Sequence, residues 1–249
     1  RYLSAHDLGI YTTALFLAQI FVAKFVPALN EVAFSAYARI QHDRAAVASA
    51  FVRAARIVMI AAMPFYIGLA VTAEPLVLTV LGEKWRETAP VIRILALAMP
   101  FMTLLVLYTP ACDASGRPGV GVRNGMVGSV ILAAAFLAGV QWGLMGLAIA
   151  WVVAYPLYFA IASWRALPVI GARAGDLARA VAPPIIAALA MGAVVVLADR
   201  LLPPLPPVRH LAILMAVGAA TYGLWLWTFA RPVVRELVAI VLKRPIAAV

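Results

Sequence analysis

Seven apolar stretches dominate the chain of 249 residues, and nearly all of its 20 Lys and Arg residues lie in the gaps between them. A hydrocarbon bilayer excludes water, so backbone that crosses it must hydrogen-bond to itself, and apolar helices of roughly 17–25 residues meet this requirement. Charged residues make up 12% of the chain, about half the share that is usual in soluble domains. The sequence therefore predicts an all-α polytopic membrane protein.

The apolar stretches predict about seven transmembrane helices. Their approximate limits are residues 8–37, 54–81, 94–112, 124–140, 143–164, 177–197 and 211–230. Pro64, Pro100 and Pro110 fall inside predicted spans. They are compatible with membrane crossing because neighbouring helices can satisfy the carbonyls that proline leaves free. A minimal turn at Gly139–Gly143 separates the fourth span from the fifth.

The charge of the gaps predicts the orientation of the spans. Counted over alternate gaps, thirteen Lys and Arg residues fall on one side of the membrane and five on the other. The more basic side is expected to face the cytoplasm. The chain then begins outside and ends inside. A proline-rich connection at residues 199–209 would lie outside, and the basic, apolar tail from Arg231 would lie as a helix on the inner leaflet.

Composition also excludes several classes of function. The net charge of +10 does not indicate nucleic-acid binding, because the basic residues lie at span ends and do not cluster with aromatics on one polar surface. Cys112 is the single cysteine, and the three histidines are far apart, so neither a metal site nor a cofactor is expected. A membrane-embedded transferase would need clustered carboxylates or histidines near one membrane face. The sequence shows no such cluster, so we expect no enzyme. The chain begins with Arg1, which suggests that an N-terminal part is missing.

The first span contains charged residues that would cost about 2.5–3.5 kcal/mol each at the centre of a bilayer. On a helical wheel the polar residues fall within about 40° of one another. They are Thr13, Lys24, Glu31 and Ser35. We expect this stripe to be buried and to line a water-filled cavity, where Lys24 would attract an anionic group and Glu31 would pair with it or bind a coupling cation. Alternatively, Glu31 reaches cytoplasmic water and Lys24 snorkels or fixes packing.

Glu74 precedes Pro75 near the outer end of the second predicted span. A carboxylate there is a candidate gate or ion site. An ordinary carboxylate at the membrane–water interface is the alternative interpretation.

Several short strings, in this order and spacing, resemble the polysaccharide flippases, which export lipid-linked O-antigen and exopolysaccharide units. The strings are LGIYTTA at 8–14, VAFSAYARIQ at 32–41, LGEKW at 81–85, APVIRILALA at 89–98 and ASGRP at 114–118. This family belongs to the multidrug/oligosaccharidyl-lipid/polysaccharide exporter superfamily. The resemblance implies a MATE-like fold of two six-helix lobes that is often followed by two extra helices. Residues 1–170 would then form the second lobe, with five spans plus the end of a preceding one. Residues 171–249 would form two additional transmembrane helices and a cytoplasmic interfacial tail.

The resemblance also implies a function. Family members move a polyprenyl-pyrophosphate-linked oligosaccharide across the bacterial inner membrane by alternating access between their lobes. Lys24 is the best candidate here for a cavity cation that contacts an undecaprenyl-pyrophosphate-linked glycan. Membrane lipid and the missing N-terminal lobe are the implied partners, and the C-terminus would be cytoplasmic.

Three other functions stay open at this point. A multidrug or cation antiporter shares the fold but would favour acidic cavity residues over Lys24. A peptidoglycan lipid-precursor flippase also shares the fold. A non-transporting scaffold of a polysaccharide export complex would have no need of Lys24.

Overall fold

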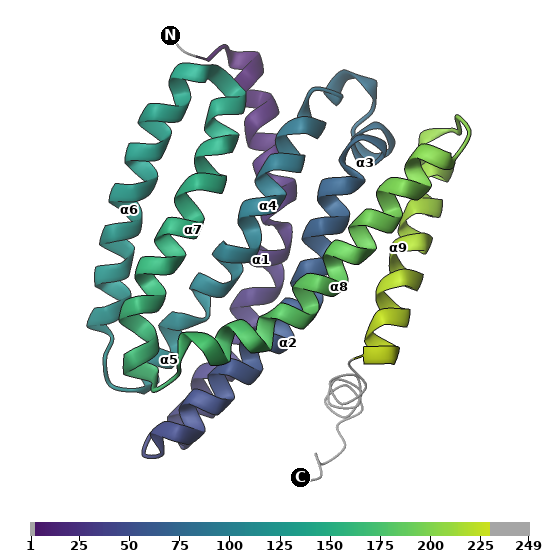
Figure 1. Cartoon of the computed structure of the whole chain (residues 1–249). Helices are drawn as coiled ribbons and strands as arrows, with labels where there is room; N and C mark the ends of the chain where they lie inside the picture. Colours follow the sequence, from purple (N-terminus) through teal and green to yellow (C-terminus); the bar gives the residue numbers. More distant parts are fainter. Residues whose placement is uncertain (1–2, 230–249) are drawn as a thin grey trace.

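The computed structural model describes residues 3–229, apart from the side chains of residues 28, 29, 31 and 32. The regular secondary structure of this part of the chain is entirely helical. The helices form one bundle whose long members run between an upper and a lower end (Figure 1). In chain order they are α1 (Ala5–Arg39), α2 (Arg44–Val71), α3 (Ala73–Val80), α4 (Thr88–Val106), α5 (Tyr108–Ala114), α6 (Gly119–Gly139), α7 (Gly143–Ile170), α8 (Ala174–Leu201) and α9 (Pro207–Phe229). The 3-10 turns η1 (Glu83–Trp85) and η2 (Val140–Trp142) lie in connections.

Six apolar segments of the described chain are long enough to cross a membrane. One of them, Gly119–Ile170, contains both α6 and α7, joined by the short turn η2. Residues 3–229 therefore contain seven helical passes, and the predicted class, an all-α polytopic protein with about seven transmembrane helices, is confirmed. The interfacial helix predicted from Arg231 lies outside the described residues.

Two predicted spans are broken by proline, and this differs from the sequence prediction. The second span ends as α2 at Val71, and α3 follows after Thr72. The third span ends as α4 at Val106, and α5 follows after Leu107. Val71 and Val106 each lie four residues before a proline, Pro75 and Pro110. Proline has no N–H to donate to the carbonyl four residues earlier, and its ring clashes there. Each break thus lies where proline removes a helical hydrogen bond.

Helix α4 lies at the centre of the bundle, between α2 and α7, and also packs on α1 (Figure 1). Its residues Ile92, Leu95 and Met99 are fully buried. Hydrogen bonds join the helices around it. Tyr66 of α2 bonds to Thr103 of α4 at 3.0 Å, and Trp151 of α7 donates to Tyr11 of α1 at 2.6 Å. Such bonds matter in a bilayer because lipid offers these groups no alternative partner.

Small residues set the closest helix contacts. Gly139 of α6 and Gly146 of α7 face each other so closely that a Cβ on either would meet the backbone of the other. Helix α8 crosses α2 in the same way, since a Cβ on Gly192 would meet Ile67. Close packing of small residues is the usual driving force for helix association in lipid. Helix α9 packs mainly on α8 and α3, at the far side of the bundle from α6.

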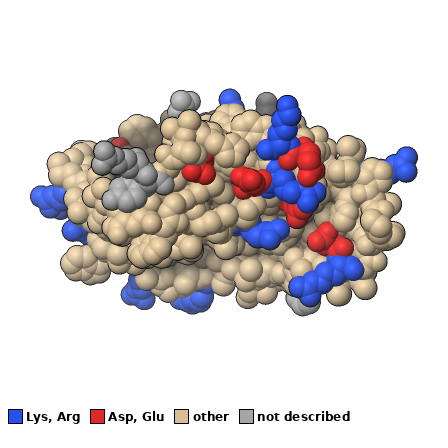
Figure 2. Space-filling view, turned by 90° about the horizontal axis from the view of Figure 1, so that it is seen from above, with Lys and Arg blue, Asp and Glu red and all other residues tan. Residues whose placement is uncertain are grey.

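The two ends of the bundle differ in charge. On the upper end, acidic side chains lie next to basic ones (Figure 2). Glu83 pairs with Arg86 at 2.8 Å, and Asp199 contacts His210 at 2.6 Å. The lower end contains the starts and ends of helices that carry Arg39, Arg44, Arg117 and Arg123, among others. The basic gaps thus come together at one end of the bundle.

Candidate functional site

The polar stripe of α1 lies on the face that the other described helices leave open. Ala14, Ala18 and Val26 on the opposite face are buried against the bundle. Thr13 is partly exposed, and Lys24 and Ser35 are exposed. The described helices do not cover this stripe, because α1 packs mainly against α4 and α5. Whether another lobe of the protein buries it stays a prediction. The structure brings these three residues onto one open face, whereas the side chain of Glu31 lies outside those described.

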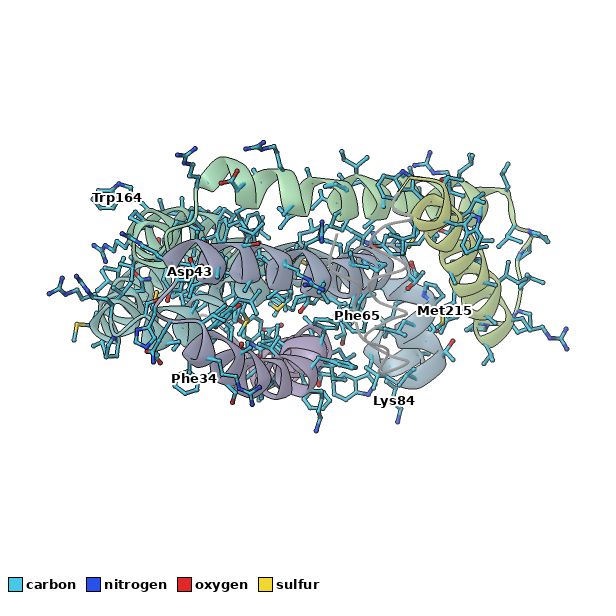
Figure 3. The ribbon with its side chains drawn as sticks, turned by 90° about the horizontal axis from the view of Figure 1, so that it is seen from below. Phe34, Asp43, Phe65, Lys84, Trp164 and Met215 are labelled. Atoms are coloured by element: carbon cyan, nitrogen blue, oxygen red, sulfur yellow. The ribbon has the colours of Figure 1, made fainter. Side chains whose placement is uncertain are left out.

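Exposed aromatic side chains of α1 flank the polar stripe on both sides. Phe16 is 66% exposed, Phe25 56% and Phe34 46%. Phe34 projects away from the bundle on the far side of α2 from α8 (Figure 3). Lys24 lies about 28 Å along the helix from Ala5 and about 22 Å from Arg39, at 1.5 Å per residue. A cation thus lies far from both ends of a long helix, on a surface that has no covering among the described residues.

A row of aromatic rings links this open face to the far side of α2. The Phe25 ring, next to Lys24, stacks on Phe21 with ring centres 5.0 Å apart. Phe21 contacts Phe65 of α2 at 5.5 Å and Tyr66 at 5.6 Å. Phe65 is also part of the wall of a cavity between α2 and α9. Ring contacts through the core therefore connect Phe25, the residue after Lys24, with the wall of the cavity.

This apolar cavity has a volume of about 320 Å³ and lies between α2, α3, α8 and α9. Phe65 and Met215 lie on opposite sides of it (Figure 3). Its few polar groups are engaged: the Tyr222 hydroxyl donates to the carbonyl of Ile60 at 2.8 Å, and the Thr72 hydroxyl donates to the carbonyl of Gly68 at 2.8 Å. The cavity therefore offers hydrocarbon surface and suits an apolar chain. The cavity could not be predicted from the sequence, because no local pattern indicates that α9 packs beside α3.

Glu74 lies at the upper end, away from the open face of α1. Its carboxylate is 3.5 Å from the guanidinium of Arg86, which also pairs with Glu83, and its side chain is 48% exposed. This arrangement is that of an interfacial carboxylate in a surface ion pair, a contact of small energy. No group of three His, Cys, Asp or Glu residues within metal-binding reach occurs in the part of the chain that is described.

The sequence is similar to proteins of polysaccharide biosynthesis. The family described as polysaccharide biosynthesis protein matches residues 1–90. The teichuronic acid biosynthesis protein TuaB of Bacillus subtilis (strain 168) is 27% identical over 194 residues, which are 77% of this chain and 40% of TuaB. The succinoglycan biosynthesis transport protein ExoT of Rhizobium meliloti (strain 1021) is 28% identical over 120 residues, 48% of this chain and 24% of ExoT. The lipopolysaccharide biosynthesis protein WzxC of Escherichia coli (strain K12) is 34% identical over 95 residues, 38% of this chain and 19% of WzxC.

The fold is that of a solved flippase. The lipid II flippase MurJ, in an inward closed conformation, superimposes with a TM-score of 0.75 over 92% of this chain and 48% of MurJ, at 15% sequence identity. The fold thus defines a polytopic membrane protein built like about half of such an exporter. Together with the sequence matches, it supports the resemblance seen in the motifs: the chain is similar to proteins of polysaccharide biosynthesis and has the fold of a lipid flippase. It spans less than half the length of each of these proteins.

Proposed function

We propose that the protein containing this chain moves a polyprenyl-pyrophosphate-linked oligosaccharide across a membrane. The main support is the geometry of α1 and α2: Lys24 is an exposed cation deep along α1, and an apolar cavity lies beside α2 on the same half of the molecule. A lipid-linked glycan has the complementary parts, an anionic pyrophosphate and a long hydrocarbon chain. Lys24 matches the pyrophosphate, and the apolar cavity matches the hydrocarbon chain.

Each surface has its own role in this proposal. Lys24 attracts the pyrophosphate, and the attraction is strong because the bilayer interior has a low dielectric constant. The carrier tail packs in the apolar cavity. The N-terminal lobe of the same protein covers the open face of α1, and rocking of the two lobes exposes the site to one side and then the other. In this division, residues 1–170 belong to the second lobe, and residues 171–249 supply the appended helices that wall the cavity.

The alternatives fit this geometry less well. A cation antiporter would need carboxylates on the open face, where the described ionisable side chain is Lys24. A scaffold would need neither an exposed cation in a span nor an apolar cavity. A peptidoglycan-precursor flippase would use the same surfaces, since its substrate has the same kind of carrier. Glu74 is proposed to act only at the interface, where its pair with Arg86 could open during a gating movement.

Transport in a defined system tests the function directly. The full-length protein is reconstituted into vesicles that contain a polyprenyl-pyrophosphate-linked oligosaccharide in both leaflets. An impermeant glycosidase is then added outside. With a transporter, we expect the enzyme to degrade nearly all of the glycan, because molecules from the inner leaflet reach it. Degradation that stops at the outer-leaflet fraction, as in protein-free vesicles, would support a scaffold.

The proposed location is a bacterial inner membrane, with the basic lower end and the C-terminus in the cytoplasm. Replacing the buried Cys112 by Cys112→Ala, together with any cysteine outside this chain, gives a background for labelling, and Ser115→Cys or Glu87→Cys then adds one thiol at the lower or upper end. In intact cells, we expect an impermeant maleimide to label position 87 but not position 115, since lower-end loops carry most basic residues. The reverse pattern would invert the orientation.

A further inference from the structure

A polar cavity of about 320 Å³ lies at the lower end of the bundle, apart from the open face of α1 and the apolar cavity. Three chain segments meet there: the start of α2, the α5–α6 connection and the last turn of α7. Its polar lining comes from Gln41, Arg44, Ser115 and Arg117. Two of the four are arginines, and no acidic residue lines the cavity.

Contacts with the end of α7 hold Arg44 at this cavity. Arg44 is the first residue of α2, and a cation is disfavoured at a helix N-terminus. Its guanidinium instead donates to the carbonyl of Pro168 in the last turn of α7, where a cation is favoured. The stem of Arg44 crosses Gly171, whose φ of +86° and missing side chain leave room for it. This bond uses one of the five N–H donors of Arg44 and keeps its guanidinium at the cavity wall.

The ASGRP string holds the second arginine. Gly116 has a φ of +72°, which glycine adopts without strain, and it turns the chain after α5. The amide of Arg117 donates to the carbonyl of Cys112 at 3.0 Å, so the turn is fixed to the end of α5. Pro118 then leads into α6. This motif, which the transport proposal does not use, places Arg117 beside Arg44.

The cavity has the charge and donors of an anion site. Among the described residues, no carboxylate forms an ion pair with Arg44 or Arg117. Asp43, the acid next in sequence, accepts the amides of Ala45 and Ala46 at the start of α2. Guanidinium groups bind phosphate through paired N–H donors, and the Gln41 amide adds further donors. A phosphate group therefore matches this lining.

The cavity also lies at the height of lipid headgroups. The candidate spans Arg44–Val71, Thr88–Ala114 and Gly119–Ile170 begin or end at its walls. Apolar helix ends mark the boundary between hydrocarbon and water, where lipid phosphates lie. We propose that this cavity binds a phosphate group, and that an anionic phospholipid of the adjacent leaflet supplies it. The proposal requires neither transport activity nor a particular orientation, because both leaflets carry phosphate.

Ligand-dependent thermal unfolding of the full-length protein in detergent tests the site. The probes are short-chain phosphatidylglycerol, short-chain phosphatidylcholine and inorganic phosphate at equal ionic strength. We expect phosphatidylglycerol to raise the unfolding temperature saturably, and Arg117→Gln to raise its half-saturating concentration about tenfold, as loss of a charge-assisted hydrogen bond implies. Phosphatidylcholine, whose choline cancels the charge, should act more weakly.

Arg123→Gln is the matched control, because Arg123 is an exposed lower-end arginine that does not line the cavity. We expect it to respond like the parent protein. An equal response to inorganic phosphate would support a phosphate site whose ligand is soluble. The proposal is overturned if Arg117→Gln responds to phosphatidylglycerol as the parent does, or if none of the phosphate probes gives a saturable response.

Discussion

Lys24→Ala in the full-length protein is expected to lower transport of a lipid-linked glycan by about tenfold to a hundredfold. The reason is that this ammonium group lies on the open face of α1, where a charge-assisted contact with a phosphate contributes about 1.5–3 kcal/mol. Because Lys24 makes no buried contact with the described helices, its removal should leave folding intact. Surface polysaccharide in cells and the vesicle assay measure the effect, and membrane abundance of the variant should stay normal.

Two further variants separate charge from shape. Lys24→Arg keeps the positive charge and should retain much of the activity, whereas Lys24→Met keeps most of the stem and should lose it. Lys84→Ala is the matched control, since Lys84 is an exposed lysine of the turn η1 at the upper end. Normal polymer in Lys24→Ala cells with normal protein levels would remove Lys24 from the mechanism.

The position of Lys24 on a polar stripe was predictable from the sequence, but its environment was not. Helical periodicity alone places Thr13, Lys24 and Ser35 on one side of α1, and the structure agrees. Burial depends on which neighbours cover that side, and periodicity does not contain this information. The expected cover is the N-terminal lobe, to which no described residue belongs, so the covering of the stripe stays a prediction. The bundle itself buries the small-residue face with Ala14 and Ala18 and leaves the stripe open.

The number and approximate position of the membrane passes could be predicted, because apolar length and loop charge are local properties of the sequence. All seven predicted passes are present, although the second begins ten residues before its expected start, at Arg44. The breaks after α2 and α4 were harder to predict, because proline in a span either kinks a helix or ends it. The outcome depends on whether neighbouring groups satisfy the freed carbonyl. Pro64 is accommodated within α2, whereas α2 ends four residues before Pro75. Sequence alone does not distinguish these cases.

The apolar cavity could not be predicted from sequence at all. Its walls come from segments separated by more than a hundred residues, and each wall resembles an ordinary apolar span. Nothing in the sequence around Phe65 indicates that its ring contacts Phe21 and also lines the cavity. The cavity also gains little from the hydrophobic effect, since lipid tails are as apolar as its lining. The cavity would therefore bind a carrier chain through its shape, so its role is tested by filling it with a larger side chain.

Ala219→Trp is expected to lower transport of a long-chain lipid-linked glycan by about tenfold, which corresponds to about 1.4 kcal/mol on the barrier. Ala219 lines the apolar cavity from α9, and an indole there would occupy much of its 320 Å³. The carrier tail would then lose its packing site beside α2, while Lys24 and the open face of α1 stay unchanged. The vesicle assay should be run with carriers of long and short isoprenoid chains. The long carrier should be affected more, because only its tail reaches the filled space.

Ala220→Trp provides the control on the same helix. Ala220 is the next residue of α9, is exposed and does not line the cavity, so its indole would point toward lipid, where tryptophan is tolerated. We expect near-normal transport from this variant and similar membrane abundance for both. Equal loss in the two variants would indicate damage to α9. Unchanged transport of long carriers by a well-folded Ala219→Trp protein would show that the tail stays in the bilayer throughout, and would leave the α1 face as the sole substrate surface on this lobe.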